Sequence, residues 1–240
     1  MGSVNTSSNT AMFSDGENRN RRLLVRRAML IAGGSFLFGF LLSCGKPAHV
    51  QGSAPAGGAA VNPVGMAVPA MELEAFYKGK ITTVRLGDYR GKWLVLFFYP
   101  SDFTFVCPTE LVEMQEYYEK FRKAGAEVVS VSTDSAYAHR GWAEAHEGVR
   151  GIRFPMASDR AGKLSRAMGV YVEEKGFAVR ASFVVNPEGV VMACEFHDEA
   201  IGRSAAELLR KLEAAVAVRE SKGDFCPAAW APGDEMVTPK

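Results

Sequence analysis

The stretch Leu94-Val-Leu-Phe-Phe-Tyr-Pro-Ser-Asp-Phe-Thr-Phe-Val-Cys107-Pro-Thr-Glu-Leu111 decides the fold. It opens within a continuous apolar run, residues 93–99, which predicts a strand buried on both faces, as in a parallel sheet. Pro100 and the polar residues after it end that strand. Beyond Cys107, apolar residues recur at the spacing of one helix face, at Leu111, Met114, Tyr118 and Phe121. The pattern predicts a strand, a short loop and a helix that begins at Cys107.

Cys107 therefore sits where a helix start offers free backbone N–H groups, which favour negative charge. A thiol in that position is expected to have an increased fraction of reactive thiolate. In a C-x-x-C disulfide exchanger the second cysteine falls three residues later, and here that residue is Glu110. Cys107 either reacts as a single thiol or pairs with a cysteine far along the chain. The alternative is a small, buried apolar residue.

Composition indicates one globular domain with an extension. The 240 residues are 48% hydrophobic, and 28 basic residues nearly balance 27 acidic ones, for a net charge of +1. This balance gives no reason to expect a nucleic-acid partner. Four cysteines are too few for a disulfide scaffold. Histidine spacing and glycine spacing predict neither a metal site nor a cofactor site, and we expect the histidines on the surface: His49, His139, His146 and His197.

Residues 1–43 are predicted to be an export signal. Residues 18–43 contain five arginines and no acidic residue, and their apolar part, 28–43, is too short to span a membrane as a helix. Arg21-Arg22 resembles a twin-arginine motif. Leu41-Leu-Ser-Cys44 resembles a lipoprotein processing site, which predicts a lipid on Cys44 and a protein anchored in the bacterial cell envelope, on the periplasmic side.

A second product is possible from the same sequence. Residues 44–65 form a linker rich in Gly, Ala and Pro, and Met66 follows it directly. If translation begins at Met66, the product is a cytoplasmic protein without an anchor.

The order of elements within residues 66–240 predicts an α/β thioredoxin-like fold, with a central mixed sheet flanked by helices. After the Cys107 helix, which ends near Lys123, a second buried strand gives a β-α-β unit with parallel strands. A hairpin of two strands and a helix opened by a Ser204–Glu207 capping box complete the order. The other expected elements are a strand at 81–84, a helix at 135–146, a strand at 154–159 and a helix at 160–168.

Residues 97–110 resemble the active-site signature of the typical two-cysteine peroxiredoxins, in their alkyl hydroperoxide reductase C and thioredoxin peroxidase branch. Pro100, Thr104 and Cys107 have the spacing of that signature without a gap. The resemblance implies the peroxiredoxin variant of the thioredoxin-like fold, and an enzyme without a cofactor. Such an enzyme would reduce hydrogen peroxide and organic hydroperoxides to water and alcohols, through a sulfenic acid on Cys107.

The resemblance also assigns the residues around the thiol. Arg180, in an Arg-x-Ser-Phe element, is the expected fixed positive charge. Thr104 is expected to hydrogen-bond a peroxide oxygen, and Pro100 to shield the sulfur from water. Glu110, one turn into the helix, is expected to orient an active-site arginine.

Cys226 lies in the C-terminal segment 221–240, expected to be mobile, where Cys-Pro-Ala-x-Trp resembles the family's resolving element. The resemblance implies a disulfide between Cys107 and Cys226 of another subunit, in a dimer that often assembles into a decamer. A thioredoxin-like protein or a flavoprotein disulfide reductase would recycle it. Cys194 is expected to be structural. Residues 148–153 lack the insertion of the hyperoxidation-sensitive relatives, which predicts a robust enzyme.

Two other functions remain open. A holdase-type chaperone assembly would use the oligomer rather than the thiol. A thiol-disulfide exchange protein would use the fold, but the missing C-x-x-C pair argues against it.

Overall fold

The computed structural model describes residues 62–221 and 223–240. The predicted export signal, Cys44 and the linker up to residue 61 lie outside this part. The strands are β1 Glu72–Tyr77, β2 Lys80–Arg85, β3 Trp93–Phe98, β4 Ala126–Ser132, β5 Met156–Ser158, β6 Tyr171–Val172, β7 Phe177–Ala178, β8 Arg180–Val185 and β9 Val191–His197. The helices are α1 Cys107–Lys123, α2 Ala136–Ala145, α3 Glu147–Arg150, α4 Lys163–Ala167 and α5 Ala205–Glu220, with a 3₁₀ helix at Leu86–Tyr89.

A seven-stranded mixed sheet is the centre of the fold, in the order β2-β1-β5-β4-β3-β8-β9. Strands β3, β4 and β5 run parallel, and the outer strands pair antiparallel with their neighbours. The predicted thioredoxin-like α/β fold is thereby confirmed. The chain contains the predicted β3-α1-β4 unit, and β9 and β2 form the two edges of the sheet.

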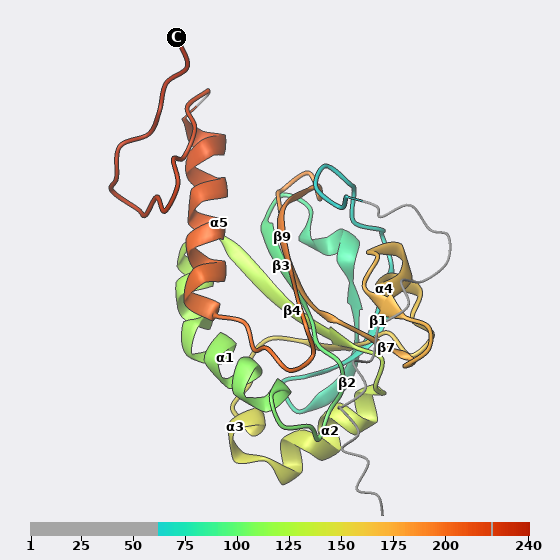
Figure 1. Ribbon diagram of the computed structural model, residues 1–240. Coiled ribbons are helices and arrows are strands. Elements are labelled where there is room, and N and C mark those ends of the chain that lie inside the picture. Colours follow the sequence, from blue (N-terminus) through green and yellow to red (C-terminus); the bar gives the residue numbers. More distant parts are fainter. Residues whose placement is uncertain (1–61, 222) are drawn as a thin grey trace, which may run out of the picture. The chain divides into compact units, whose positions relative to one another are not determined.

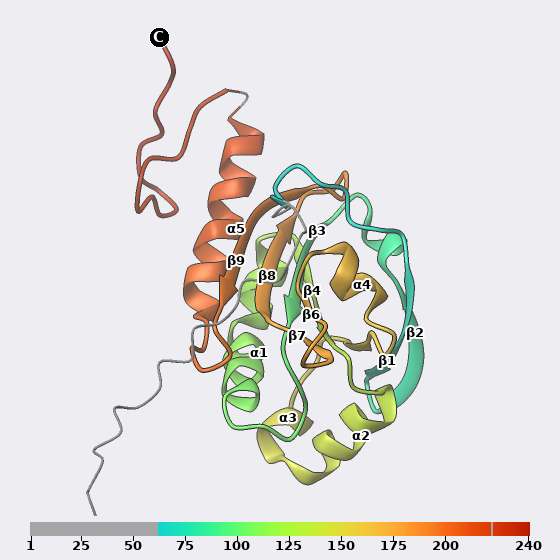
Figure 2. The ribbon, with the colours of Figure 1, turned by 45° about the vertical axis from the view of Figure 1, so that its right-hand side comes forward.

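All residues of strand β3 are buried, which shows that both faces of this strand are covered. Side chains alternate across a strand, so Val95 and Phe97 enter one apolar core and Leu94 and Leu96 enter the other. Helices α1 and α5 cover the first face and α4 covers the second (Figures 1 and 2). The continuous apolar run in the sequence reflects these two cores.

Helix α1 begins and ends where the sequence predicts. Cys107 is its first residue, Pro108 occupies the first turn, and Lys123 is its last residue. Gly125 follows with φ +82°, a left-handed conformation that suits glycine and ends the helix.

Several elements differ from the prediction. The helix expected at 160–168 is shorter, because the Asp159 carboxylate binds the backbone N–H groups of Leu164 and Ser165 and holds the preceding residues in a turn. The expected capping box is only half present: Ser204 accepts from the Glu207 backbone N–H, but the Glu207 side chain binds Arg210.

Strand β1, helix α3 and the β6–β7 pair were not predicted, since each is short or weakly patterned. None of the helices in the described part combines the length and apolar character that a membrane-spanning helix needs.

Candidate active site

The sheet brings Arg180 to Cys107. Strands β3 and β8 pair antiparallel, with Phe98 opposite Ala181, so β8 begins beside the loop through which the chain leaves β3. That loop leads to the start of α1. As a result, the Nη1 atom of Arg180 donates to the Cys107 sulfur at 3.3 Å, and both side chains are buried. The fixed positive charge of Arg180 therefore faces the thiol at the start of α1.

Glu110 connects this pair to a second arginine. Its Oε2 accepts from Arg180 Nη1 at 2.6 Å, and its Oε1 accepts from the Arg203 backbone N–H at 2.8 Å and from Arg203 Nε at 2.9 Å. Burial alone raises the pKa of Glu110, but the hydrogen bonds and charge of Arg203, followed by the charge of Arg180, outweigh it and lower the pKa below its ordinary value. Glu110 therefore stays ionised between two cations.

Arg203 was not among the residues predicted from the sequence. It is 5% exposed, directly precedes the N-cap Ser204 of α5, and its guanidinium lies 3.5 Å from the centre of the Phe97 ring. Its Nη1 also donates to Ala181 O at 2.8 Å. Burial lowers the pKa of Arg203, while hydrogen bonding to Glu110 opposes that shift. Through its contacts with the Glu110 carboxylate and with Ala181, Arg203 connects the starts of α1, β8 and α5.

The loop before Cys107 holds the other predicted residues. Pro100 is buried, directly after β3. Thr104 is exposed, and its hydroxyl donates to Ser101 O at 2.9 Å, so it braces the loop. Phe103 has φ +55°, a left-handed conformation that costs a non-glycine residue free energy. Thr104 thus lies on the loop, and its hydroxyl hydrogen-bonds Ser101 O rather than the Cys107 sulfur.

A buried Asp–His pair fixes the start of this loop. His139 Nδ1 lies 2.8 Å from Asp102 Oδ2, and the Tyr99 hydroxyl donates to Asp102 Oδ1 at 2.8 Å. Burial raises the pKa of Asp102, and His139 partly opposes this. His139 is 0% exposed, so the prediction that all the histidines lie on the surface is wrong for His139. The prediction rested on the polarity of histidine. The sequence does not show the buried partner Asp102, which lies 37 residues away from His139.

Cys226 lies away from Cys107 within the same chain. Its sulfur is 3.5 Å from Ala214 O, on α5. Ala214 is ten residues beyond Ser204, which corresponds to about 15 Å along the helix from the arginine–glutamate cluster. Cys107, Cys194 and Cys226 are all free thiols. Cys194 is half-buried on β9, where burial raises its pKa.

These features define a class: a buried cysteine at a helix start, with a braced arginine on its sulfur, in a thioredoxin-like fold. A family model described as the AhpC/TSA family matches residues 64–194. The chain is 43% identical over 166 residues to alkyl hydroperoxide reductase C of Salmonella typhimurium, covering 69% of this chain and 89% of the relative. It is 42% identical over 176 residues to alkyl hydroperoxide reductase C of Bacillus subtilis, covering 73% and 94%.

Solved structures support the same family assignment. The structure of Enterococcus faecalis AhpC has a TM-score of 0.68 and 46% identity, covering 70% of this chain and 100% of that one. The reduced 2-Cys peroxiredoxin of Plasmodium vivax has a TM-score of 0.69 and 31% identity, covering 73% and 93%. The chain belongs to the AhpC/TSA family. It is a peroxiredoxin, an enzyme of the thiol peroxidase class, as the sequence predicts.

Proposed function

We propose that Cys107 is the peroxidatic thiol and that it reduces hydrogen peroxide and organic hydroperoxides. The observation that carries this is the single Arg180 nitrogen 3.3 Å from the Cys107 sulfur and 2.6 Å from Glu110. The Cys107 thiolate attacks one peroxide oxygen, the O–O bond breaks, and the leaving alkoxide or hydroxide takes a proton. Its relatives are named for hydroperoxide reduction, which supports this substrate class.

Arg180 and Glu110 have separate roles in this step. The guanidinium of Arg180 holds a positive charge and several N–H donors where the thiolate and the departing oxygen develop negative charge. Glu110 fixes the guanidinium by a charge-assisted hydrogen bond and does not itself touch the sulfur. Pro100 shields the loop side of the site from water. When substrate binds, the Thr104 hydroxyl leaves Ser101 O and hydrogen-bonds a peroxide oxygen.

Cys226 of a second subunit is proposed to resolve the sulfenic acid. A disulfide needs Cα atoms within about 7 Å, whereas the Cys226 of the same chain is docked roughly 15 Å along α5 from the Cys107 cluster. The Cys226 sulfur attacks the Cys107 sulfur, the S–O bond breaks, and water leaves.

The surface supports an oligomer with two kinds of contact. Strand β9 is a sheet edge, and it carries the exposed apolar residues Met192 and Phe196. Pairing of two such edges gives a two-fold dimer. Exposed apolar side chains also lie on the active-site loop, at Phe103 and Phe105, and in the first turn of α2, at Tyr137; Phe105 is 96% exposed. We propose that dimers associate through these residues into a decamer.

A thioredoxin-like protein or a flavoprotein disulfide reductase is proposed as the electron donor. Both reduce an exposed disulfide by thiol exchange, which the Cys107–Cys226 bond would allow.

For the location we propose export and a lipid anchor on Cys44. The basic region and the short apolar run before Cys44 support it, and a start at Met66 would give the cytoplasmic form instead. Fractionation of the native protein with intact mass of the N-terminus distinguishes the two. A lipid-bearing Cys44 supports the proposal, and an N-terminus at Met66 contradicts it.

The disulfide is tested by mixing two variants, neither of which can complete the catalytic cycle by itself. Subunits of Cys107→Ser and Cys226→Ser are unfolded together, refolded as mixed dimers and treated with peroxide. Each mixed dimer contains one Cys107 and one Cys226 on different chains, so we expect a disulfide-linked dimer and partial recovery of turnover. Absence of that crosslink, with a monomeric disulfide in the wild-type protein, would show that resolution occurs within one chain. Cys194→Ser serves as the control and should behave like wild type.

A further inference from the structure

The loop between β3 and α1 contains one residue in an unfavourable backbone conformation. Phe103 has φ +55°, in the left-handed region that non-glycine residues rarely adopt. Its ring lies 6.0 Å from the ring of Trp142, but the residue is 62% exposed, so contacts of its own side chain offset only part of the cost. Such a conformation persists only where the surrounding structure holds it. Thr104 follows directly, so its position depends on this turn.

Asp102, the residue before Phe103, is held from three sides. Its backbone N–H donates to Asp134 Oδ2 at 2.9 Å, and the Tyr99 hydroxyl donates to its Oδ1 at 2.8 Å. Its Oδ2 lies 2.8 Å from His139 Nδ1. Asp102 is 5% exposed and His139 is 0% exposed, so water does not compete for the contact between them. These hydrogen bonds attach one side of the strained turn to α2 and to the end of β4.

His139 supplies the contact to the second carboxylate oxygen. Because Oδ1 of Asp102 accepts from Tyr99, we assign the imidazole proton to Nδ1, from which it is donated to Oδ2. Nε2 of His139 is then a buried acceptor without a hydrogen-bond partner among residues 62–221 and 223–240. A buried acceptor without a partner costs free energy. The imidazole thus brings one unsatisfied atom and one favourable contact, and that contact is to the active-site loop.

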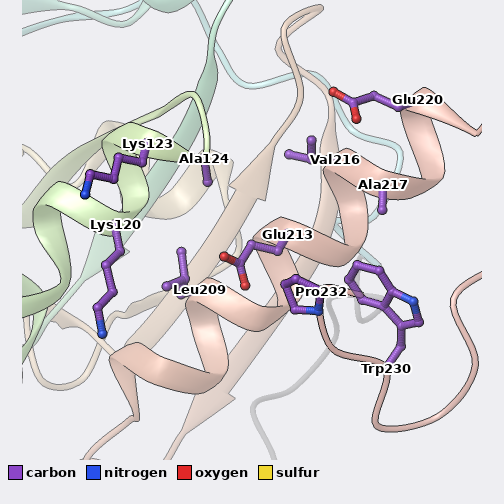
Figure 3. A pocket seen from close by; sticks show the side chains of 10 residues that line it. All are labelled: Lys120, Lys123, Ala124, Leu209, Glu213, Val216, Ala217, Glu220, Trp230 and Pro232. Carbon is purple, nitrogen blue, oxygen red and sulfur yellow. The ribbon is translucent and has the colours of Figure 1, made fainter. Parts of the chain in front are cut away.

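The two ends of α1 are held differently. A cavity of about 410 Å³ lies beside its C-terminal end, between this helix and α5. Figure 3 shows Lys120 and Lys123 of α1 on the opposite side of this cavity from Trp230. Side chains that line a void lose the dispersion contacts that a filled space would give. The loop at the other end is joined to α2 and β4 by buried hydrogen bonds, so the start of α1 is held more firmly than its end.

We propose that His139 is a positioning residue for the reaction with peroxide: through Asp102 it holds the strained turn at Phe103, which keeps the Thr104 hydroxyl within reach of the peroxide. This inference rests on the proposed function, in which Cys107 attacks the peroxide and Thr104 hydrogen-bonds it. His139 hydrogen-bonds Asp102 rather than the sulfur. Without that contact the turn relaxes, Thr104 moves away from the site, and sulfenic acid formation slows.

Two replacements of His139 separate its volume from its N–H donor. His139→Leu keeps most of the volume but removes the donor, and it should slow sulfenic acid formation by about tenfold, the scale of one charge-assisted hydrogen bond. His139→Asn places an amide N–H near the position of Nδ1 and should restore most of the wild-type rate. Arg140→Ala is the matched control on α2, because Arg140 pairs with Glu144 on the exposed face.

Phe103→Gly tests the role of the backbone strain. Glycine adopts the left-handed conformation without a steric cost, so the turn no longer depends on the contact between Asp102 and His139. Within the Phe103→Gly background, His139→Leu should therefore have little further effect on the rate. A general loss of packing around residue 139 would instead slow both backgrounds by the same factor.

The experiment measures two reactions of Cys107 in the full chain. Reduced protein is mixed with hydrogen peroxide, and sulfenic acid formation is followed by stopped flow. In parallel, alkylation by iodoacetamide is measured by mass on the peptide that contains Cys107, because this reaction does not use Thr104. The inference expects His139→Leu to slow the reaction with peroxide and not the alkylation. Near-UV circular dichroism shows whether each variant is folded. If His139→Leu is not folded, Asp102→Asn weakens the same contact and should give the same kinetic loss.

Equal peroxide rates in His139→Leu, Arg140→Ala and wild type would overturn the inference. An undiminished loss in the Phe103→Gly background would also overturn it, as would equal slowing of the alkylation, because His139 would then act on the thiol itself. Failure of the proposed function gives a different result, in which Thr104→Val reacts with peroxide as fast as wild type. Failure of the inference alone leaves Thr104→Val slow and His139→Leu fast.

Discussion

The Nη1 atom of Arg180 donates to both the Cys107 sulfur, at 3.3 Å, and the Glu110 carboxylate, at 2.6 Å. The shorter bond is the charge-assisted one, and it fixes the direction from which the guanidinium faces the thiol. The reactivity of the sulfur therefore depends on a carboxylate that does not touch it.

Replacement of Glu110 by glutamine tests that dependence. Glu110→Gln keeps the size of the side chain but leaves Arg180 and Arg203 buried without their shared negative charge. We expect kcat/KM for hydrogen peroxide to fall by about ten- to a hundredfold and the free energy of unfolding to fall by about 2–4 kcal/mol. Stopped-flow kinetics and urea unfolding measure the two effects. Glu116→Gln, on the exposed face of the same helix, should change neither; equal effects in both variants would contradict the account.

The lowered pKa of Glu110 predicts that the free energy of unfolding decreases in acid. The pKa of Glu110 is lower in the folded protein than its ordinary value, so the folded state binds fewer protons than the unfolded state in the range between the two. Glu110 therefore contributes stability that is fully present above its unfolded pKa, near 4.5, and is lost as the pH falls through the folded value. Urea unfolding from pH 6 to about pH 3 should show a shallower loss in Glu110→Gln than in wild type. Parallel curves would rule out this contribution.

The two arginines should differ when each is changed to lysine. Arg180→Lys removes the guanidinium whose Nη1 reaches both the sulfur and the carboxylate, so we expect a roughly hundredfold loss in the rate of sulfenic acid formation. Arg203 contacts Glu110, Phe97 and Ala181 but not the thiol. Arg203→Lys should therefore mainly lower the thermal midpoint, with a smaller kinetic loss. A larger kinetic loss for Arg203→Lys than for Arg180→Lys would reverse the assignment.

The edge of the sheet gives a prediction on assembly. In a two-fold pairing of β9 edges, Met192→Lys places two like charges near each other, so the dimer should weaken. Thr82→Lys makes the same change on β2, the opposite edge, and should leave the assembly intact. Analytical ultracentrifugation of the reduced proteins distinguishes them. If Thr82→Lys is the variant that dissociates, the dimer uses the other edge.

Much of the site could be predicted from the sequence because its signals are local. The run from β3 into α1 has the periodicity of a buried strand and an amphipathic helix, so the position of Cys107 follows from it. Arg203 and His139 could not be placed in this way. The contact of Arg203 with Glu110 spans 93 residues, and that of His139 with Asp102 spans 37. Each pairing depends on which helices and loops the tertiary fold brings together.

The contacts within residues 224–238 could not be predicted for a related reason. The composition of this segment, with its glycine, proline and aspartate, is typical of a mobile tail. The sequence does not show that Phe225 pairs with Val237 or that Arg210, on the preceding helix, binds the Trp230 carbonyl. Those contacts fold the segment without a regular helix or strand pattern.

The most direct test of the account is the reaction of the reduced protein with one equivalent of hydrogen peroxide, followed by peroxide consumption and intact mass. Wild type and Cys194→Ser should consume the peroxide rapidly and form a disulfide-linked dimer. Cys226→Ser should consume it equally fast and stop at a sulfenic acid on Cys107, whereas Cys107→Ser should not react. Peroxide consumption by Cys107→Ser at the wild-type rate would contradict the central claim that Cys107 is the peroxidatic thiol.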